Sequence, residues 1–242
     1  MKSSLISLLQ LLFSLAMYLM GIVFFGLALA PGVYIFLRVW EASANFSLFG
    51  RCVALGMSIA LGYFLFGLTL VFLVGITRTV LRLRLKEGNH RIFSFEAAKW
   101  AFISCLYLLV NFTFIYFILL TPFANWLLRM LGAKIGRNVQ VNSKFIFDAT
   151  LLEIGDNTII GGGAIIIGHQ VERGHLKLRK VKIGKNVTIG SNAIIPPGCE
   201  IGDNAIIGAG AVLLKNTKVG PRELWYGVPA QNVRKRQHKE EG

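Results

Sequence analysis

Two signals along the chain predict an α-helical transmembrane domain followed by an all-β domain, a parallel β-helix of hexapeptide repeats. The first half contains three long charge-free runs, and the second half places an aliphatic residue at every sixth position. The composition agrees with a divided chain, because 54% hydrophobic residues and a formal net charge of +14 are an unusual combination for a single soluble domain.

The charge-free runs cover residues 3–37, 52–77 and 100–128. A membrane-spanning helix needs about 20 mostly apolar residues, so each run is long enough. A cleaved signal peptide has an apolar core of only about 7–15 residues, which argues against that reading of the first run. We therefore expect a multi-pass domain over residues 1–125 in the cell (inner) membrane, with membrane lipids as partners.

The six-residue rhythm defines the second domain, residues 126–236, which is followed by a charged tail at 237–242. Hexapeptide periodicity is typical of a β-helix, in which the aliphatic residue points inward and neighbouring coils bury each other's apolar faces. Asn157, Asn186, Asn192 and Asn204 suit its turns. The inward positions are Ile183, Ile189, Ile195, Ile201, Ile207, Leu213 and Val219 downstream, and Ile135, Val141, Phe147, then after a slip of one residue Ile154, Ile160 and Ile166 upstream.

The chain's ending and its junction carry a family resemblance. GAGAVLLKNTKVGPRELWYGVPAQNVRK (208–235) resembles the closing coil and Gly-x-Pro-Ala signature of the hexapeptide-repeat acyltransferases. LLTPFANWLLRMLGAKIG (119–136) is similar to the membrane-attached acyltransferase-like modules of poly-lysine synthetase-type enzymes. The resemblance implies a left-handed β-helix, a homotrimer, and acyl-CoA or a carrier-bound thioester as co-substrate, with no permanently bound cofactor.

The repeat is interrupted once, where 17 positions separate Ile166 from Ile183 instead of six. We expect residues 168–181 to form an inserted loop, and irregular loops on rigid scaffolds are common functional sites. In the family that the chain resembles, a histidine at the base of the loop is the general base, and His169 matches it by position. Histidine suits this role because its ordinary pKa of about 6.5 leaves the ring neutral near pH 7.

Other residues around the loop are candidates for supporting roles. Asp148 and Glu153 lie about one coil before His169, so either carboxylate is a candidate to orient the imidazole. Arg173 and His175 lie inside the loop and are candidates for the acceptor site. A zinc site is disfavoured because catalytic zinc requires three protein ligands, and no metal is expected.

The resemblance also suggests how the donor is held. Backbone N–H groups near Gly190, Ser191 and Ala209 are candidates to stabilise the oxyanion, and Lys215 matches a cofactor-facing lysine. Arg234 and Lys235 are candidates to bind the nucleotide phosphates.

The membrane half implies an amphiphilic or lipid-linked acceptor, and no nucleic-acid partner is expected. VLRLRLK (80–86) alternates apolar and basic residues, and Arg78, Arg82 and Lys86 would also align on one helical face; either geometry suits an interfacial position beside anionic lipid. This basic segment and the β-helix should both face the cytoplasm, so the 100–128 run is predicted to be re-entrant or bent.

The sequence is compatible with three functions. The first is acyl transfer from acyl-CoA to a hydroxyl or amine on a membrane-associated acceptor, with His169 as base. The second is aminoacyl or peptide transfer from a carrier-bound thioester. The third is a non-enzymatic trimeric membrane scaffold.

Overall fold

The computed structural model describes residues 2–233, so Arg234, Lys235 and the charged tail lie outside the described residues. The chain divides into two compact units. One comprises Met1–Thr77 with Leu108–Thr113, and the other Arg78–Tyr107 with Phe114–Gly242. The segment 78–107, which the sequence assigns to the membrane domain, therefore belongs to the same unit as the β-helix.

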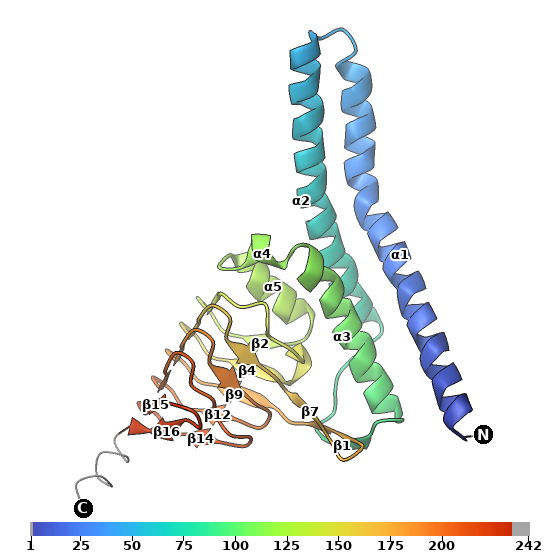
Figure 1. Ribbon diagram of the computed structural model, residues 1–242. Helices are drawn as coiled ribbons and strands as arrows, with labels where there is room; N and C mark the ends of the chain where they lie inside the picture. Colours follow the sequence, from blue (N-terminus) through green and yellow to red (C-terminus); the bar gives the residue numbers. More distant parts are fainter. Residues whose placement is uncertain (1, 234–242) are drawn as a thin grey trace, which may run out of the picture. The chain divides into compact units, whose positions relative to one another are not determined.

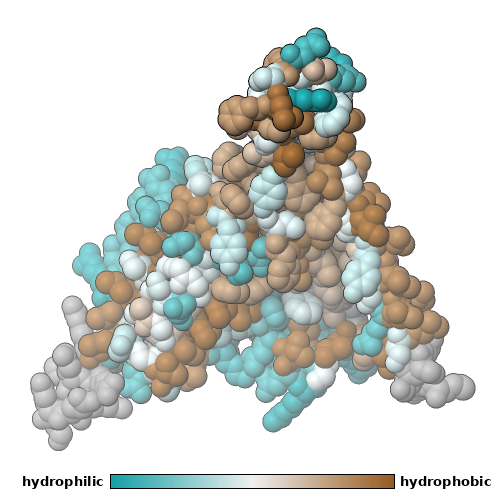
Figure 2. Space-filling view, turned by 45° about the horizontal axis from the view of Figure 1, so that its top comes forward, coloured by the Kyte–Doolittle hydropathy of each residue, from teal (hydrophilic) through white to brown (hydrophobic). Residues whose placement is uncertain are grey.

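The first unit is dominated by two long helices, α1 (Lys2–Ala42) and α2 (Leu48–Val80) (Figure 1). Both helices, like α3 (Phe95–Thr113), are long and apolar enough to span a membrane. Their leucine, valine and phenylalanine side chains are widely exposed, and hydrophobic residues cover much of the surface in Figure 2. An exposed apolar surface of this extent is stable in lipid rather than in water.

The third charge-free run is not one helix. It is divided among α3, α4 (Ile115–Ile118) and α5 (Pro122–Met130). The Thr121 hydroxyl caps α5 by accepting the Phe123 N–H at 3.2 Å, and Pro122 occupies the first helical position, where its missing N–H costs no hydrogen bond. The chain therefore turns between α4 and α5 before it enters the β-helix.

The second unit contains a parallel β-helix with three ladders of short strands (Figure 1). The predicted inward residues from Ile183 to Val219 are at most 4% exposed. The predicted asparagines have the left-handed backbone that the turns require. The first ladder contains β2 (Lys134–Ile135), β4 (Leu152–Ile154), β9 (Val181–Ile183), β12 (Glu200–Ile201) and β14 (Lys218–Val219). The second contains β3 (Gln140–Val141), β5 (Ile159–Ile160), β10 (Thr188–Ile189), β13 (Ile206–Ile207) and β15 (Leu224–Tyr226), and the antiparallel strand β16 (Gln231–Asn232) pairs with β15 at its end. The third contains β6 (Ile165–Ile166) and β11 (Ile194–Ile195).

One predicted inward position is wrong. Ile146, not Phe147, faces the core: it is 1% exposed and forms a parallel bridge with Ile166. The chain then bulges through Asp148, whose φ of 57° is left-handed, into a 3₁₀ turn over Ala149–Leu151. The slip in the repeat therefore marks a bulge, and the bulge presents Asp148.

The inserted segment is an antiparallel sheet rather than an irregular loop. β7 (His169–Glu172) and β8 (His175–Leu178) form a hairpin, and β1 (Gly88–Arg91) pairs with β8 as a third strand. Flanking residues add a small apolar cluster of Leu85, Ala97, Ile103, Leu151, Leu176 and Leu178, against which Leu83 and Trp100 pack.

Of the two geometries that VLRLRLK suits, the structure has the alternating one rather than the helical face. α2 ends at Val80, and Arg82 has a left-handed φ of 49°. Leu83 and Leu85 then point into the apolar cluster, while Arg82, Arg84 and Lys86 are exposed. The alternation of apolar and basic residues reflects an extended chain with one buried side, which has a period of two.

Candidate active site

His169 and Asp148 meet at the base of the inserted hairpin. The His169 Nδ1 lies 2.6 Å from the Asp148 Oδ2. The aspartate side chain is 1% exposed, whereas the histidine side chain is 26% exposed. The carboxylate is thus sealed from water, and the imidazole remains accessible to a substrate.

The Asp148 carboxylate accepts hydrogen bonds from three donors. Oδ2 accepts the Gly168 backbone N–H at 2.9 Å in addition to His169, and Oδ1 accepts the Trp100 Nε1–H at 2.8 Å. An ionised carboxylate offers only acceptors, so Nδ1 of His169 carries the hydrogen in this arrangement. Nε2 of the neutral ring is then unprotonated and able to accept a proton.

Gly168 allows His169 to approach the bulge closely. A Cβ atom at position 168 would lie 3.1 Å from both Asp148 Cβ and Leu151 Cβ, which is tighter than ordinary packing. The absence of a side chain at this residue therefore lets the start of β7 lie against Asp148.

We expect Gly168→Ala to lower the free energy of unfolding by about 1–3 kcal/mol through overpacking, and to reduce any His169-dependent activity about tenfold or more. The matched control is Gly162→Ala, since a Cβ there would meet the Asn142 side chain at 3.5 Å and the Asn142 backbone oxygen at 3.8 Å, both ordinary contacts. Thermal unfolding and turnover of the two variants measure this. Equal stability and equal activity of the two variants would contradict the account.

Glu153 is not brought to His169. It lies on β4 and pairs with Lys134 at 2.9 Å and Lys180 at 4.0 Å. The hydrogen bond from Lys134 holds the pKa of Glu153 below its ordinary value. Of the two candidate orienting carboxylates, only Asp148 contacts the histidine.

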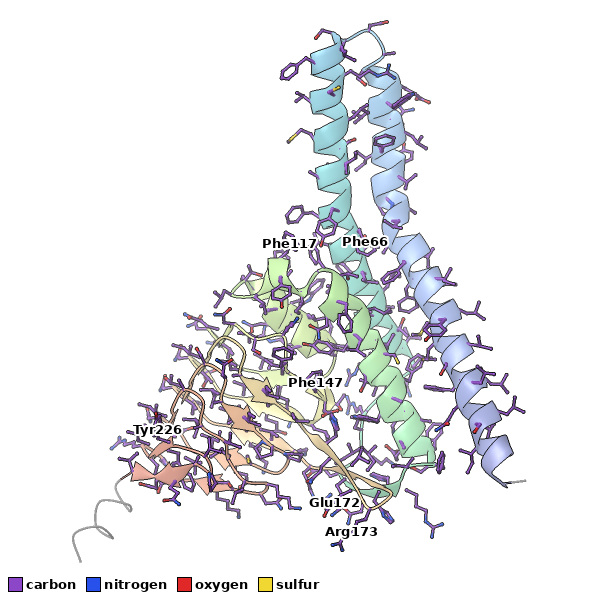
Figure 3. All side chains as sticks on the ribbon, viewed as in Figure 1. Phe66, Phe117, Phe147, Glu172, Arg173 and Tyr226 are labelled. Carbon is purple, nitrogen blue, oxygen red and sulfur yellow. The ribbon has the colours of Figure 1, made fainter. Side chains whose placement is uncertain are left out.

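Arg173 and His175 lie at the other end of the hairpin. Arg173 is in its turn with a φ of 50°, and the exposed His175 ring contacts the Arg173 carbonyl oxygen at 3.0 Å. Figure 3 shows Glu172 and Arg173 at this tip. β7 thus separates these candidates from His169.

The donor-side candidates lie on the coils that follow the hairpin. Gly190, Ser191 and Ala209 stack at one corner of successive coils, because a Cβ on Gly190 would collide with the Ala209 backbone nitrogen. The Gly190 N–H is not an oxyanion donor, since it donates to the Ile207 carbonyl oxygen at 2.7 Å within the ladder.

Lys215 lies beside the hairpin. Its Nζ is 3.4 Å from the Glu172 carboxylate, which also accepts Lys177 at 2.8 Å. Two lysines therefore share one carboxylate, and together they hold the pKa of Glu172 below its ordinary value. They line a polar cavity of about 140 Å³ together with Asn89, Gln170, Arg179, Pro197 and Asn216.

Trp100 is the contact that sequence reasoning missed. It lies in α3, 48 residues before Asp148, at the start of a run that reads only as membrane sequence. A single tryptophan beside the basic end of an apolar run is typical of a membrane interface, so the sequence contains no separate signal for a site role.

Comparisons with known proteins agree with the repeat. Residues 180–215 match the family model described as bacterial transferase hexapeptide (six repeats). The chain is 28% identical over 169 residues to the delta-poly-L-ornithine synthetase of Acinetobacter baumannii (strain AB307-0294), covering 67% of this chain and 12% of that protein. It is 36% identical over 95 residues to a proposed acetyltransferase of Bacillus subtilis (strain 168), YvoF, covering 36% of this chain and 55% of that protein.

Among solved structures, a maltose O-acetyltransferase from Clostridium difficile 630 is similar over 62% of this chain and 92% of its own, with 25% identity and a TM-score of 0.49. The chain spans about half of one curated relative and a small part of the other. The predicted resemblance to hexapeptide-repeat transferases and to synthetase-type modules is confirmed. The β-helix of this chain therefore carries the hexapeptide repeat of the bacterial transferases.

Proposed function

We propose that the chain is a membrane-bound acyltransferase that moves a short acyl group from acyl-CoA to a hydroxyl or amine of a membrane-associated acceptor. The observation that carries the proposal is the contact of His169 with a buried carboxylate, at the base of a hairpin inserted into a hexapeptide β-helix. The similarity to a proposed acetyltransferase and to the transferase repeat family supports this class of reaction.

The reaction follows from the protonation state of the dyad. Nε2 of His169 takes the proton from the acceptor O–H or N–H while the acceptor atom bonds to the acyl carbon. Collapse of the tetrahedral intermediate breaks the carbon–sulfur bond. The thiolate of CoA leaves and takes the proton from the imidazolium. Asp148 stays ionised throughout and stabilises the positive ring.

The donor is assigned to the coils after the hairpin. We assign Lys215, which lines the polar cavity beside the hairpin, to a phosphate of CoA, and Ser191 and Ala209 lie where the backbone of successive coils meets at one corner. Arg234 and Lys235 remain predicted phosphate ligands. We include in the proposal a left-handed helix and a homotrimer, as the family resemblance implies.

The acceptor is assigned to the membrane side. The β1–β8 pairing holds residue 88 against residue 178, so the end of α2 and the β-helix lie on one side of the bilayer, which we assign to the cytoplasm. The α3–α5 stretch begins after β1 and ends at β2, and both of these strands belong to the second unit, although Leu108–Thr113 belongs to the first. A single crossing by this stretch is incompatible with that pairing, which supports a bent or re-entrant path.

This topology predicts a labelling pattern for single cysteines in a background without the three native ones. Asn45→Cys tests the α1–α2 connection, Phe93→Cys the segment after β1, and Lys218→Cys the β-helix; all three positions are exposed. An impermeant maleimide applied to intact and to opened cells should modify positions 93 and 218 from the same side and position 45 from the other. Opposite labelling of 93 and 218 would overturn the topology.

The function is tested with the full chain in lipid nanodiscs that contain a bacterial polar lipid extract and radiolabelled acetyl-CoA. Transfer of the label to an amphiphile supports the proposal. The poly-ornithine synthetase similarity covers 67% of the chain and favours a second candidate, transfer of an aminoacyl group from a carrier-bound thioester. Transfer from a carrier thioester, with none from acetyl-CoA, would establish that candidate instead.

A further inference from the structure

We infer that Trp100 of α3 is a positioning residue for the His169–Asp148 dyad, acting through the carboxylate and on the imidazole face. This inference rests on the proposed function, because it assigns Trp100 a part in the proton transfer by His169. Its consequence is that α3 supplies part of the active site of the β-helix, in addition to any role at the membrane.

The first contact is the hydrogen bond that the indole donates. Trp100 Nε1–H donates a hydrogen bond to Asp148 Oδ1 at 2.8 Å, while Asp148 Oδ2 accepts the hydrogen bonds from Gly168 N–H and His169 Nδ1. The indole therefore fixes the plane of the carboxylate, so that Oδ2 and not Oδ1 faces the histidine. The aspartate side chain is only 1% exposed, so water cannot readily replace the indole N–H when Trp100 is substituted.

The second contact is between the rings. The Trp100 and His169 ring centroids are 4.8 Å apart with the planes tilted by 55°. Indole has the most favourable aromatic face for a cation, and the imidazole becomes a cation when it takes the acceptor's proton. Trp100 thus acts on His169 in two ways, through this ring contact and through the carboxylate that it orients.

The indole is itself held by packing. It lies against the apolar cluster of α3, β8 and the 3₁₀ turn, which includes Ala97, Leu176 and Leu151. The simplest competing role is that of a core aromatic residue in this cluster. Two properties separate the roles: a core residue needs no N–H donor, and it has no effect on the charge state of His169.

Two substitutions of Trp100 separate the effect of the hydrogen bond from that of the ring contact. Trp100→Phe keeps an aromatic face and removes the donor, and we expect kcat to fall about tenfold, the worth of one hydrogen bond to a charged group, with KM for acetyl-CoA unchanged. Trp100→Leu removes both, and we expect a fall of about a hundredfold. Ile103→Val, in the same helix and cluster, is the matched control and should retain wild-type turnover.

The pH profile separates positioning from packing. Loss of Trp100 removes both the ring beside the imidazole and the donor that orients its carboxylate. The acidic limb of kcat/KM should therefore shift in Trp100→Leu and stay in place in Ile103→Val. In an Asp148→Asn background, Trp100→Phe should have little further effect on kcat, since the two side chains act as one unit. Full additivity of the two substitutions, or an unmoved acidic limb, would overturn the inference.

A substrate-independent arm keeps this test separate from the proposed function. Diethyl pyrocarbonate modifies neutral imidazole, and peptide mass spectrometry resolves His169 from His90, His175 and His238. The pH dependence of the His169 modification rate should shift in Trp100→Leu but not in Ile103→Val. This shift with no acyl transfer by the wild type would support the positioning role while the proposed function fails. Identical rate profiles in all variants would refute the positioning role.

Discussion

His169→Ala should lower kcat for acyl transfer about 10³-fold, with little change in KM for acyl-CoA, because general-base catalysis contributes about 10²–10⁴-fold. The imidazole is the accessible member of the dyad, 26% exposed against 1% for Asp148. Its removal eliminates the group that takes the acceptor's proton and leaves the donor-binding coils unchanged. Steady-state turnover with saturating acceptor lipid measures the effect.

The comparison variant is His175→Ala. His175 is exposed at the hairpin tip, so we expect its turnover to remain within about twofold of the wild type, as for most surface substitutions. Both variants should unfold within a few degrees of the wild type. A larger loss from His175→Ala than from His169→Ala would reassign the base to the tip of the hairpin.

Asp148→Asn should have the second-largest effect, a fall in kcat of about 10²-fold or more. The amide has nearly the shape of the carboxylate but carries no charge, and one of its two polar ends is a donor. Directed at Trp100 or at Gly168 and His169, that donor meets another donor, and the imidazole loses its negative partner. Turnover measured across pH, together with thermal unfolding, tests this.

Glu153→Gln is the matched carboxylate control. Glu153 pairs with Lys134 and Lys180 on the coil surface, where single ion pairs contribute little. Its turnover should equal that of the wild type. If Glu153→Gln lost as much activity as Asp148→Asn, the orienting carboxylate would be wrongly assigned.

The sequence was most informative where the fold repeats. Six-residue spacing identifies the inward side chains because each coil imposes the same requirement, and Ile189, Ile195 and Ile207 are completely buried. The same regularity made both the insertion and the one-residue slip visible. The insertion led to His169, and the slip lies at the bulge that presents Asp148. The inward residue predicted at the slip is nevertheless one position too late, Phe147 instead of Ile146, since both residues are apolar.

Contacts between residues far apart in the chain could not be predicted from the spacing of the repeat. β1 and β8 pair residues that are far apart in the chain, and β1 is a short polar segment with no strong strand propensity of its own. Trp100 reaches Asp148 across 48 positions from a helix whose composition indicates only membrane. Both contacts depend on tertiary packing, for which no local period exists. The sequence of VLRLRLK shows the alternation of apolar and basic residues. That pattern alone does not distinguish an extended chain with one buried side from a lipid-facing helix.

The central claim is that the His169–Asp148 dyad transfers an acyl group from CoA to a membrane-borne acceptor. Its most direct test measures free CoA thiol and labelled amphiphile in the same nanodisc sample, for wild type and for His169→Ala. The account predicts equal amounts of thiol and acylated amphiphile from the wild type, and the loss of both in the variant at unchanged thermal stability. Thiol release without acylated amphiphile, or equal transfer by His169→Ala, would contradict it.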